Sequence, residues 1–241
     1  GNSFALLLCS GVVLTAFGYA FSKPVLFAFG ASADSYVFAD AYLKIYLAGT
    51  VFAMIATGMN GYINAQGFPK IGMLSVLIGA VTNIILDPVF IFGVDALGIP
   101  AMGAAGAAIA TVLGQWVAAA LALFFNLKFN PDVHLSLKNI LPKVDVIGPI
   151  LTVGVPSMIM NSVSSVMNFS MNQILLGFPS VGEIATGVFS IYYKLQSFFF
   201  MPLFGLNNAA ISIIAFNYGA RKPERITKTL KISLVSALTF M

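Results

Sequence analysis

Residues 71–93 read IGMLSVLIGAVTNIILDPVFIFG, an apolar run that contains Asn83 and Asp87. A helix needs about 20 predominantly apolar residues to cross a bilayer, so this run is long enough to span one. Asp87 lies four residues after Asn83 and directly before Pro88, well inside the run. A carboxylate at that depth is costly unless it is protonated, paired or bound to a cation, and such acids usually mark a path for ions or protons. The stretch therefore predicts a membrane span and, within it, a candidate cation site.

Apolar residues dominate the whole chain of 241 residues, not only this run. The sequence is 59% hydrophobic and 8% charged, and its mean hydropathy is +0.95. Soluble domains carry about 25% charged residues, so a water-soluble fold of this size would lack polar surface. Six runs are long enough to span a bilayer and a seventh begins near the end of the sequence: 4–21, 41–65, 71–93, 103–126, 146–177, 181–216 and from about 230. We therefore expect an all-α, polytopic membrane protein.

Basic residues are concentrated on alternate connections between these runs. The second, fourth and sixth connections hold nine of the twelve Lys and Arg residues: Lys70, Lys128, Lys138, Lys143, Arg221, Lys222, Arg225, Lys228 and Lys231. By the positive-inside rule, these connections face the cytoplasm. We therefore expect a multi-pass protein of the cell membrane, more specifically of a bacterial or archaeal cytoplasmic membrane, with lipid around it and no nucleic-acid partner.

The longest connection, residues 128–145, divides the spans into two groups. It contains two prolines, and its His134 is expected to be a solvated loop residue rather than a ligand. We predict four spans in residues 1–127, a cytoplasmic linker in 128–145, and two spans with the start of a third in 146–241. The sequence lacks an initiator Met, and it starts and stops at apolar runs, so we expect it to be part of a longer protein.

Asn83, Asp87 and Thr111 form the candidate cation site. Asn83 and Asp87 share one face of a helix because they are four residues apart. Asp87 would lie roughly 9 Å below the outer membrane surface and Thr111, on the next span, roughly 12 Å below it, at about 1.5 Å per residue. Small residues would let the two helices approach closely; they are Gly103, Gly106, Ala107, Ala110 and Gly114. Oxygen ligands suit Na⁺, or a carboxylate that exchanges a proton. The simpler alternative is that Asp87 caps a polar turn near the interface.

A neutral polar stripe marks the span 146–177. Its members fall within roughly 100 degrees of one another on a helical wheel; they are Ser157, Asn161, Ser164, Ser165, Asn168 and Asn172. Such a stripe must face protein or water rather than lipid. It would line a cavity or form hydrogen bonds between helices. As substrate-cavity candidates we take Asn161, Ser165, Asn168 and Asn172, together with Tyr192 on the following span.

Four segments resemble the multidrug and toxic compound extrusion (MATE) transporters. They are NIILDPVFIFG at 83–93, MGAAGAAIATVLGQ at 102–115, GVPSMIMNSVSSVMNFSMNQILL at 154–176 and PLFGLNNAAISIIAFNYGARKPER at 202–225. The resemblance covers essentially the whole chain. Family members have twelve helices in two six-helix lobes, so the resemblance implies that this chain supplies helices three to eight and the start of nine.

The resemblance implies a cation-coupled antiporter, not an enzyme, that exports amphipathic or cationic organic compounds by alternating access. Asn83, Asp87 and Thr111 match three residues of the family's first-lobe cation site, and the fourth, an Asp on helix one, lies outside this sequence. Some members carry a Glu on helix seven, whereas the span 146–177 holds no acid, which favours first-lobe coupling. No cofactor is implied beyond the coupling ion, Na⁺ or H⁺. We expect a monomer at full length.

Two alternatives have different chemistry. A lipid-linked oligosaccharide flippase of the same superfamily would share the fold, and a basic groove that binds pyrophosphate would favour it. A membrane-embedded transferase would need clustered acids to hold magnesium and diphosphate. Asp87 is the only acid deep in a predicted span, so the sequence disfavours the enzyme.

Overall fold

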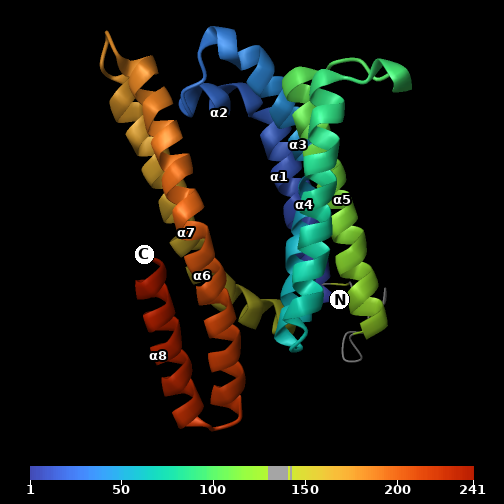
Figure 1. Cartoon of the computed structure of the whole chain (residues 1–241), viewed down its shortest axis with the longest axis vertical. Helices are drawn as coiled ribbons and strands as arrows, with labels where there is room; N and C mark the ends of the chain where they lie inside the picture. The colour runs from blue at the N-terminus through green and yellow to red at the C-terminus, as the bar shows by residue number, and fades with distance from the viewer. Residues whose placement is uncertain (130–140, 142) are drawn as a thin grey trace. The chain divides into compact units, whose positions relative to one another are not determined.

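The computed structural model describes residues 1–129, 141 and 143–241, and Figure 1 shows its helices. The elements are α1 (Asn2–Ala20), α2 (Ser22–Ala28), α3 (Ala33–Ala65), α4 (Pro69–Phe92), the 3-10 turn η1 (Asp95–Leu97), α5 (Gly103–Phe129), α6 (Val144–Leu176), α7 (Gly182–Gly219) and α8 (Pro223–Phe240). The described residues form no strand, and the all-α prediction is confirmed. Most of the predicted linker, including His134 and Lys138, lies outside the described residues.

Within the described residues, six helices are long and apolar enough to cross a membrane, namely α1, α3, α4, α5, α6 and α7. They correspond to the six complete runs predicted from the sequence. Many large apolar side chains on them are exposed, among them Ile84 at 67% and Phe198 at 71%. Lipid tails can cover such a surface without cost, whereas water cannot.

The first connection differs from the prediction. The run 4–21 ends as a helix at Ala20, and a second short helix, α2, follows directly. α3 starts at Ala33, eight residues before the predicted run 41–65. A capping box explains this start, because Ser32 Oγ accepts from Ser35 N at 3.3 Å and Ser35 Oγ accepts from Ser32 N at 2.9 Å. Hydropathy reads only the apolar part of a helix, and the polar first turns are therefore missed.

Small residues bring α4 and α5 together. A methyl group added to Gly114 would lie 2.7 Å from the carbonyl oxygen of Gly79, and one added to Gly79 would lie 2.8 Å from the oxygen of Gly114. One added to Gly106 would meet the carbonyl of Phe90. The two backbones therefore touch, as the small-residue spacing predicts. The amide of Met102 also donates to Phe90 O at 3.0 Å, which fixes the start of α5 beside the end of α4.

The chain groups into two compact units, Gly1–Ile174 and Leu175–Met241. In the first, α3 packs on α1, α4 and α5, around a core of Ile55, Met59, Ala119 and Ala122. In the second, α7 packs on α8 through the tight turn at 220–222. The predicted division into 1–127, 128–145 and 146–241 stays a prediction.

Candidate functional site

The structure brings Asn83, Asp87 and Thr111 together at the contact of α4 and α5. The Asn83 amide donates from Nδ2 to Asp87 Oδ1 at 3.1 Å and to Thr111 Oγ1 at 3.4 Å. The Thr111 hydroxyl itself donates to Ala107 O at 2.9 Å. All three side chains are half-buried. The cluster thus joins a carboxylate, an amide and a hydroxyl from two apolar helices.

The glycine contact positions this cluster. Gly79 precedes Asn83 by one helical turn, and Gly114 lies close to one turn after Thr111. A methyl group added to Gly114 would lie 3.1 Å from the Cβ of Asn83. The absence of side chains at both glycines therefore lets the Asn83 amide reach across to α5.

Pro88 follows the carboxylate, and α4 continues through it to Phe92. A proline has no amide hydrogen, so the carbonyl of Ile84 loses its usual helical donor. Pro88 thus removes one hydrogen bond from an otherwise unbroken helix. The freed carbonyl lies within the same turn as Asn83.

The hydrogen bonds define what the cluster can bind. The Thr111 hydroxyl already uses its hydrogen on Ala107 O, so it offers α4 only an acceptor. Asp87 is likewise an acceptor when ionised. Asn83 Nδ2 donates to both the Asp87 and the Thr111 oxygen. A rotation of the Asn83 amide would turn its own oxygen, Oδ1, toward them instead. The Asp87 and Thr111 oxygens share one donor, and together with a rotated Asn83 Oδ1 they would form a set of three oxygens that a monovalent cation or a proton could join.

The polar side chains of the α6 stripe bond to different partners along the length of the helix. Asn161 donates to Ser157 O at 2.8 Å and Asn168 to Ser164 O at 2.9 Å, so both bond their own helix. Asn161 and Ser165 are exposed, and Asn168 is half-buried. Asn172 instead donates to Phe29 O at 3.1 Å, and Gln173 donates to Ala28 O. The end of the stripe therefore attaches α6 to α2, which fits the interhelical alternative. Tyr192 lies exposed on α7, in the second unit.

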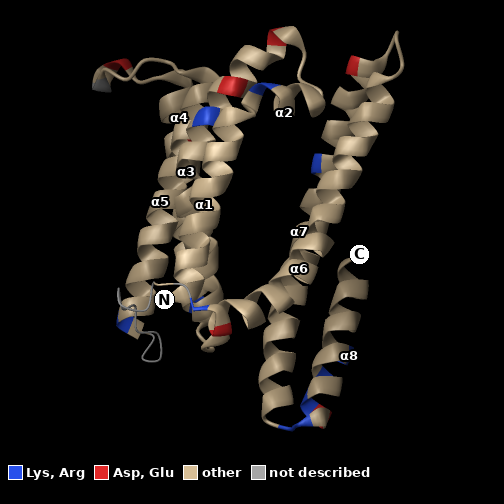
Figure 2. Ribbon diagram, turned by 180° about the vertical axis from the view of Figure 1, so that it is seen from behind, with Lys and Arg blue, Asp and Glu red and all other residues tan. Residues whose placement is uncertain are grey.

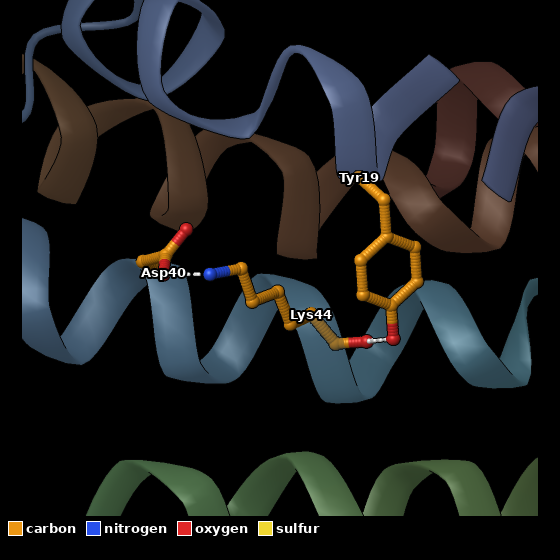
Figure 3. A network of polar contacts seen from close by, with 3 residues as sticks. All are labelled: Tyr19, Asp40 and Lys44. Carbon is orange, nitrogen blue, oxygen red and sulfur yellow. Dashed lines mark hydrogen bonds and ion pairs between the residues drawn. The ribbon is translucent and has the colours of Figure 1, made fainter. Parts of the chain in front are cut away.

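A second polar cluster lies outside the site that the sequence predicts. Asp40 Oδ2 lies 2.6 Å from Lys44 Nζ on α3, and the Tyr19 hydroxyl of α1 donates to the Lys44 carbonyl oxygen at 2.7 Å (Figure 3). The predicted run began at residue 41 and so left Asp40 out. The four-residue spacing of Asp40 and Lys44 was the available signal.

Two amide side chains also join the helices near the C-terminal ends of α3 and α5. Asn126, which is fully buried, donates to Met59 O at 2.9 Å. Asn60 donates to Gly72 O at 2.6 Å and to Ser75 Oγ at 3.0 Å. These bonds satisfy polar groups inside apolar packing and hold α3 against α4 and α5.

The chain resembles known multidrug transporters in sequence. It is 25% identical over 237 residues to the multidrug export protein MepA of Staphylococcus saprophyticus, covering 98% of this chain and 50% of that protein. The MepA protein of Staphylococcus aureus gives the same identity and coverage. The chain thus spans about half the length of the curated relatives it matches.

Solved structures of transporters also match this chain. An outward-facing conformation of a multidrug resistance MATE family transporter of the MOP superfamily matches with a TM-score of 0.81 and 26% identity, covering 99% of this chain and 51% of that one. An inward-facing conformation matches with a TM-score of 0.75 and 26% identity, covering 99% and 52%. The MatE family model matches residues 1–89 and 156–241, well over half of the chain. The resemblance seen in the sequence is therefore confirmed: this multi-pass membrane chain belongs to the MatE family.

Proposed function

We propose that the full-length protein is a cation-coupled antiporter that exports amphipathic or cationic organic compounds by alternating access, acting as a monomer. Na⁺ or H⁺ would bind at Asn83, Asp87 and Thr111. The observation that carries this proposal is the Asn83 amide, which reaches both Asp87 and Thr111 between two membrane helices. The multidrug export proteins among its relatives, and the inward- and outward-facing structures that it resembles, support it.

The cluster suggests how a cation would act. A cation bound among the three oxygens would compete with the Asn83 amide hydrogens for Asp87 and Thr111. The amide would then rotate or withdraw, and the link between α4 and α5 would pass from a hydrogen bond to the ion. A bound cation can drive transport only if it favours one conformation over another. The helix contact at this cluster is the element that would differ between them.

The exported compound would use the second group of helices. We keep Asn161, Ser165 and Asn168 of α6 and Tyr192 of α7 as candidates for contact with this compound. Asn161, Ser165 and Tyr192 are exposed, and Asn168 is half-buried. Asn172, which already bonds Phe29, would contribute chiefly by holding α6 in place. Apolar walls with a few polar groups suit amphipathic compounds.

Export of a fluorescent organic cation from proteoliposomes containing the full-length protein tests this function. An imposed Na⁺ or pH gradient should drive dye movement, and Asp87→Asn should reduce the gradient-driven rate by roughly tenfold or more, within the usual range of coupling free energies. Asp95→Asn is the matched control, because Asp95 is an exposed acid in η1, outside the spans. Gradient-driven dye transport by Asp87→Asn at the rate of the unaltered protein would remove Asp87 from the mechanism.

A further inference from the structure

The turn between α7 and α8 and the first half of α8 carry a dense group of cations. Five basic side chains stand there against the single acid Glu224, and all are exposed: Arg221, Lys222, Arg225, Lys228 and Lys231. We call these five residues the basic face. None of them forms an ion pair within the part of the chain that the structure describes. Figure 2 shows the basic residues gathered where α7 meets α8.

Helix stability does not account for this group. Arg221 and Lys222 follow the C-terminus of α7, where positive charge is favourable. Arg225 instead lies in the first turn of α8, where the helix dipole disfavours a cation. Lys228 and Lys231 extend the charge further along the same helix. Arg225 therefore has a cost within its own helix, and the helix dipole gives no reason for Lys228 and Lys231.

Two of the three cations of α8, Lys228 and Lys231, face away from α7. The half-buried residues of α8 are those that pack on its neighbour: Ile226, Thr229, Ser233 and Ala237. At 100 degrees per residue these four lie within roughly 80 degrees of one another. By the same count Lys228 and Lys231 lie on the opposite side of the helix, and Arg225 lies between the two sides. The three cations rise roughly 9 Å along the helix, at about 1.5 Å per residue.

The position of the stripe along α8 indicates its surroundings. After Lys231 the helix becomes mostly apolar, with exposed Ile232, Leu234, Val235 and Leu238. The charges therefore end where the hydrocarbon region of a bilayer would begin. Lysine stems lie along apolar surface while their ammonium groups reach toward headgroups. The positive-inside rule accounts for charge on the turn, but it does not require cations that continue for two helical turns along α8.

We propose that the basic face binds the headgroups of anionic phospholipids at the membrane surface. The charge complementarity is direct, because five cations with one acid meet phosphate groups that carry negative charge. This site is separate from the cation cluster of α4 and α5, and it does not depend on which ion drives transport.

Lipid binding to the full-length protein in nanodiscs tests the proposal. Phosphatidylglycerol bound to the protein is measured by native mass spectrometry as its fraction in a phosphatidylcholine bilayer is raised. We compare Lys228→Gln/Lys231→Gln with Lys70→Gln/Lys143→Gln, which removes the same charge from two other basic connections. Near an anionic surface each cation contributes about fivefold in binding, so the first variant should bind phosphatidylglycerol roughly 30-fold more weakly. The control should stay within about twofold of the unaltered protein, because Lys70 and Lys143 lie on two different connections and not in the group of five cations that forms the basic face.

Two further measurements keep the outcome decisive. Lys228→Arg/Lys231→Arg keeps the charge and should retain binding, and raised salt should weaken binding in the unaltered protein. Equal binding of phosphatidylglycerol and phosphatidylcholine by the unaltered protein would overturn the proposal without any variant. So would equal losses in the Gln variant and its control. A lower unfolding midpoint of the Gln variant in pure phosphatidylcholine would also overturn it, because the charges would then pair with another protein segment.

Discussion

At the scale of single residues, the candidate site depends on which atoms donate and which accept. Asn83 supplies hydrogens to two oxygens that come from different helices. Thr111 is fixed as an acceptor because its own hydrogen bonds Ala107 O. A hydroxyl held in this way has a defined role, and its removal has a defined consequence.

Thr111→Val should weaken the coupling ion while leaving the fold intact. Valine keeps the shape of threonine but lacks the oxygen, so the site loses one of its three oxygen-bearing side chains. We expect the cation concentration for half-maximal dye transport to rise by roughly tenfold, a typical coupling free energy. Thr82→Val is the matched control, because Thr82 also bonds its own helix, at Ile78 O, but has no partner on α5. Equal effects of the two changes would mean that the Thr111 oxygen is not a ligand.

At the scale of helices, α4 and α5 hold the site through glycines. Gly79 and Gly114 let the two backbones touch, and the Asn83 amide lies beside that contact. The small residues of 103–114 predict close approach of a neighbouring helix. Which polar groups lie at that contact follows from the depth of Asp87 and Thr111 in their spans, not from the spacing alone.

Gly114→Ala should separate α4 from α5. The new methyl group would lie 2.7 Å from the Gly79 carbonyl oxygen, which is backbone and cannot rotate away. We expect a loss of about 1–3 kcal/mol in stability, as for other overpacked contacts, together with weaker cation coupling. Thermal unfolding in detergent and dye transport measure the two effects. Gly61→Ala on α3 is the control, since a methyl group there meets nothing within 4 Å. An unfolding midpoint for Gly114→Ala equal to that of Gly61→Ala would contradict the role of this contact.

The sequence predicted the helices better than their polar ends. Apolar length identified all six spans, because the bilayer sets that length. It could not show the break at Phe21 or the start of α3 at Ala33, because a capping box and local backbone geometry determine them. For the same reason the predicted run 41–65 leaves out Asp40, the ion-pair partner of Lys44. The stripe of α6 could be recognised from its spacing, but whether each amide bonds its own helix or a neighbour depends on packing that spacing does not reveal.

At the scale of the whole molecule, charge and helix order together predict the topology. The basic connections alternate with connections that hold few cations, and six candidate spans separate them. If Lys and Arg set the orientation, the connection after α3 lies in the cytoplasm and the one that contains η1 lies outside. The outer ends of α4 and α5 would then carry Asp87 and Thr111 toward the external solution, from which a coupling ion would enter.

Cysteine labelling in intact cells measures this orientation. Gln66 and Asp95 are exposed and lie on consecutive connections, after α3 and in η1 respectively. In a full-length Cys9→Ser background freed of other cysteines, Asp95→Cys should react with a membrane-impermeant maleimide from outside. Gln66→Cys should react only after the cells are opened, because it faces the cytoplasm. Reaction of Gln66→Cys in intact cells, with Asp95→Cys protected, would reverse the topology. The cation site would then open toward the cytoplasm through the connection that contains η1, and an inward ion gradient could not load it from outside.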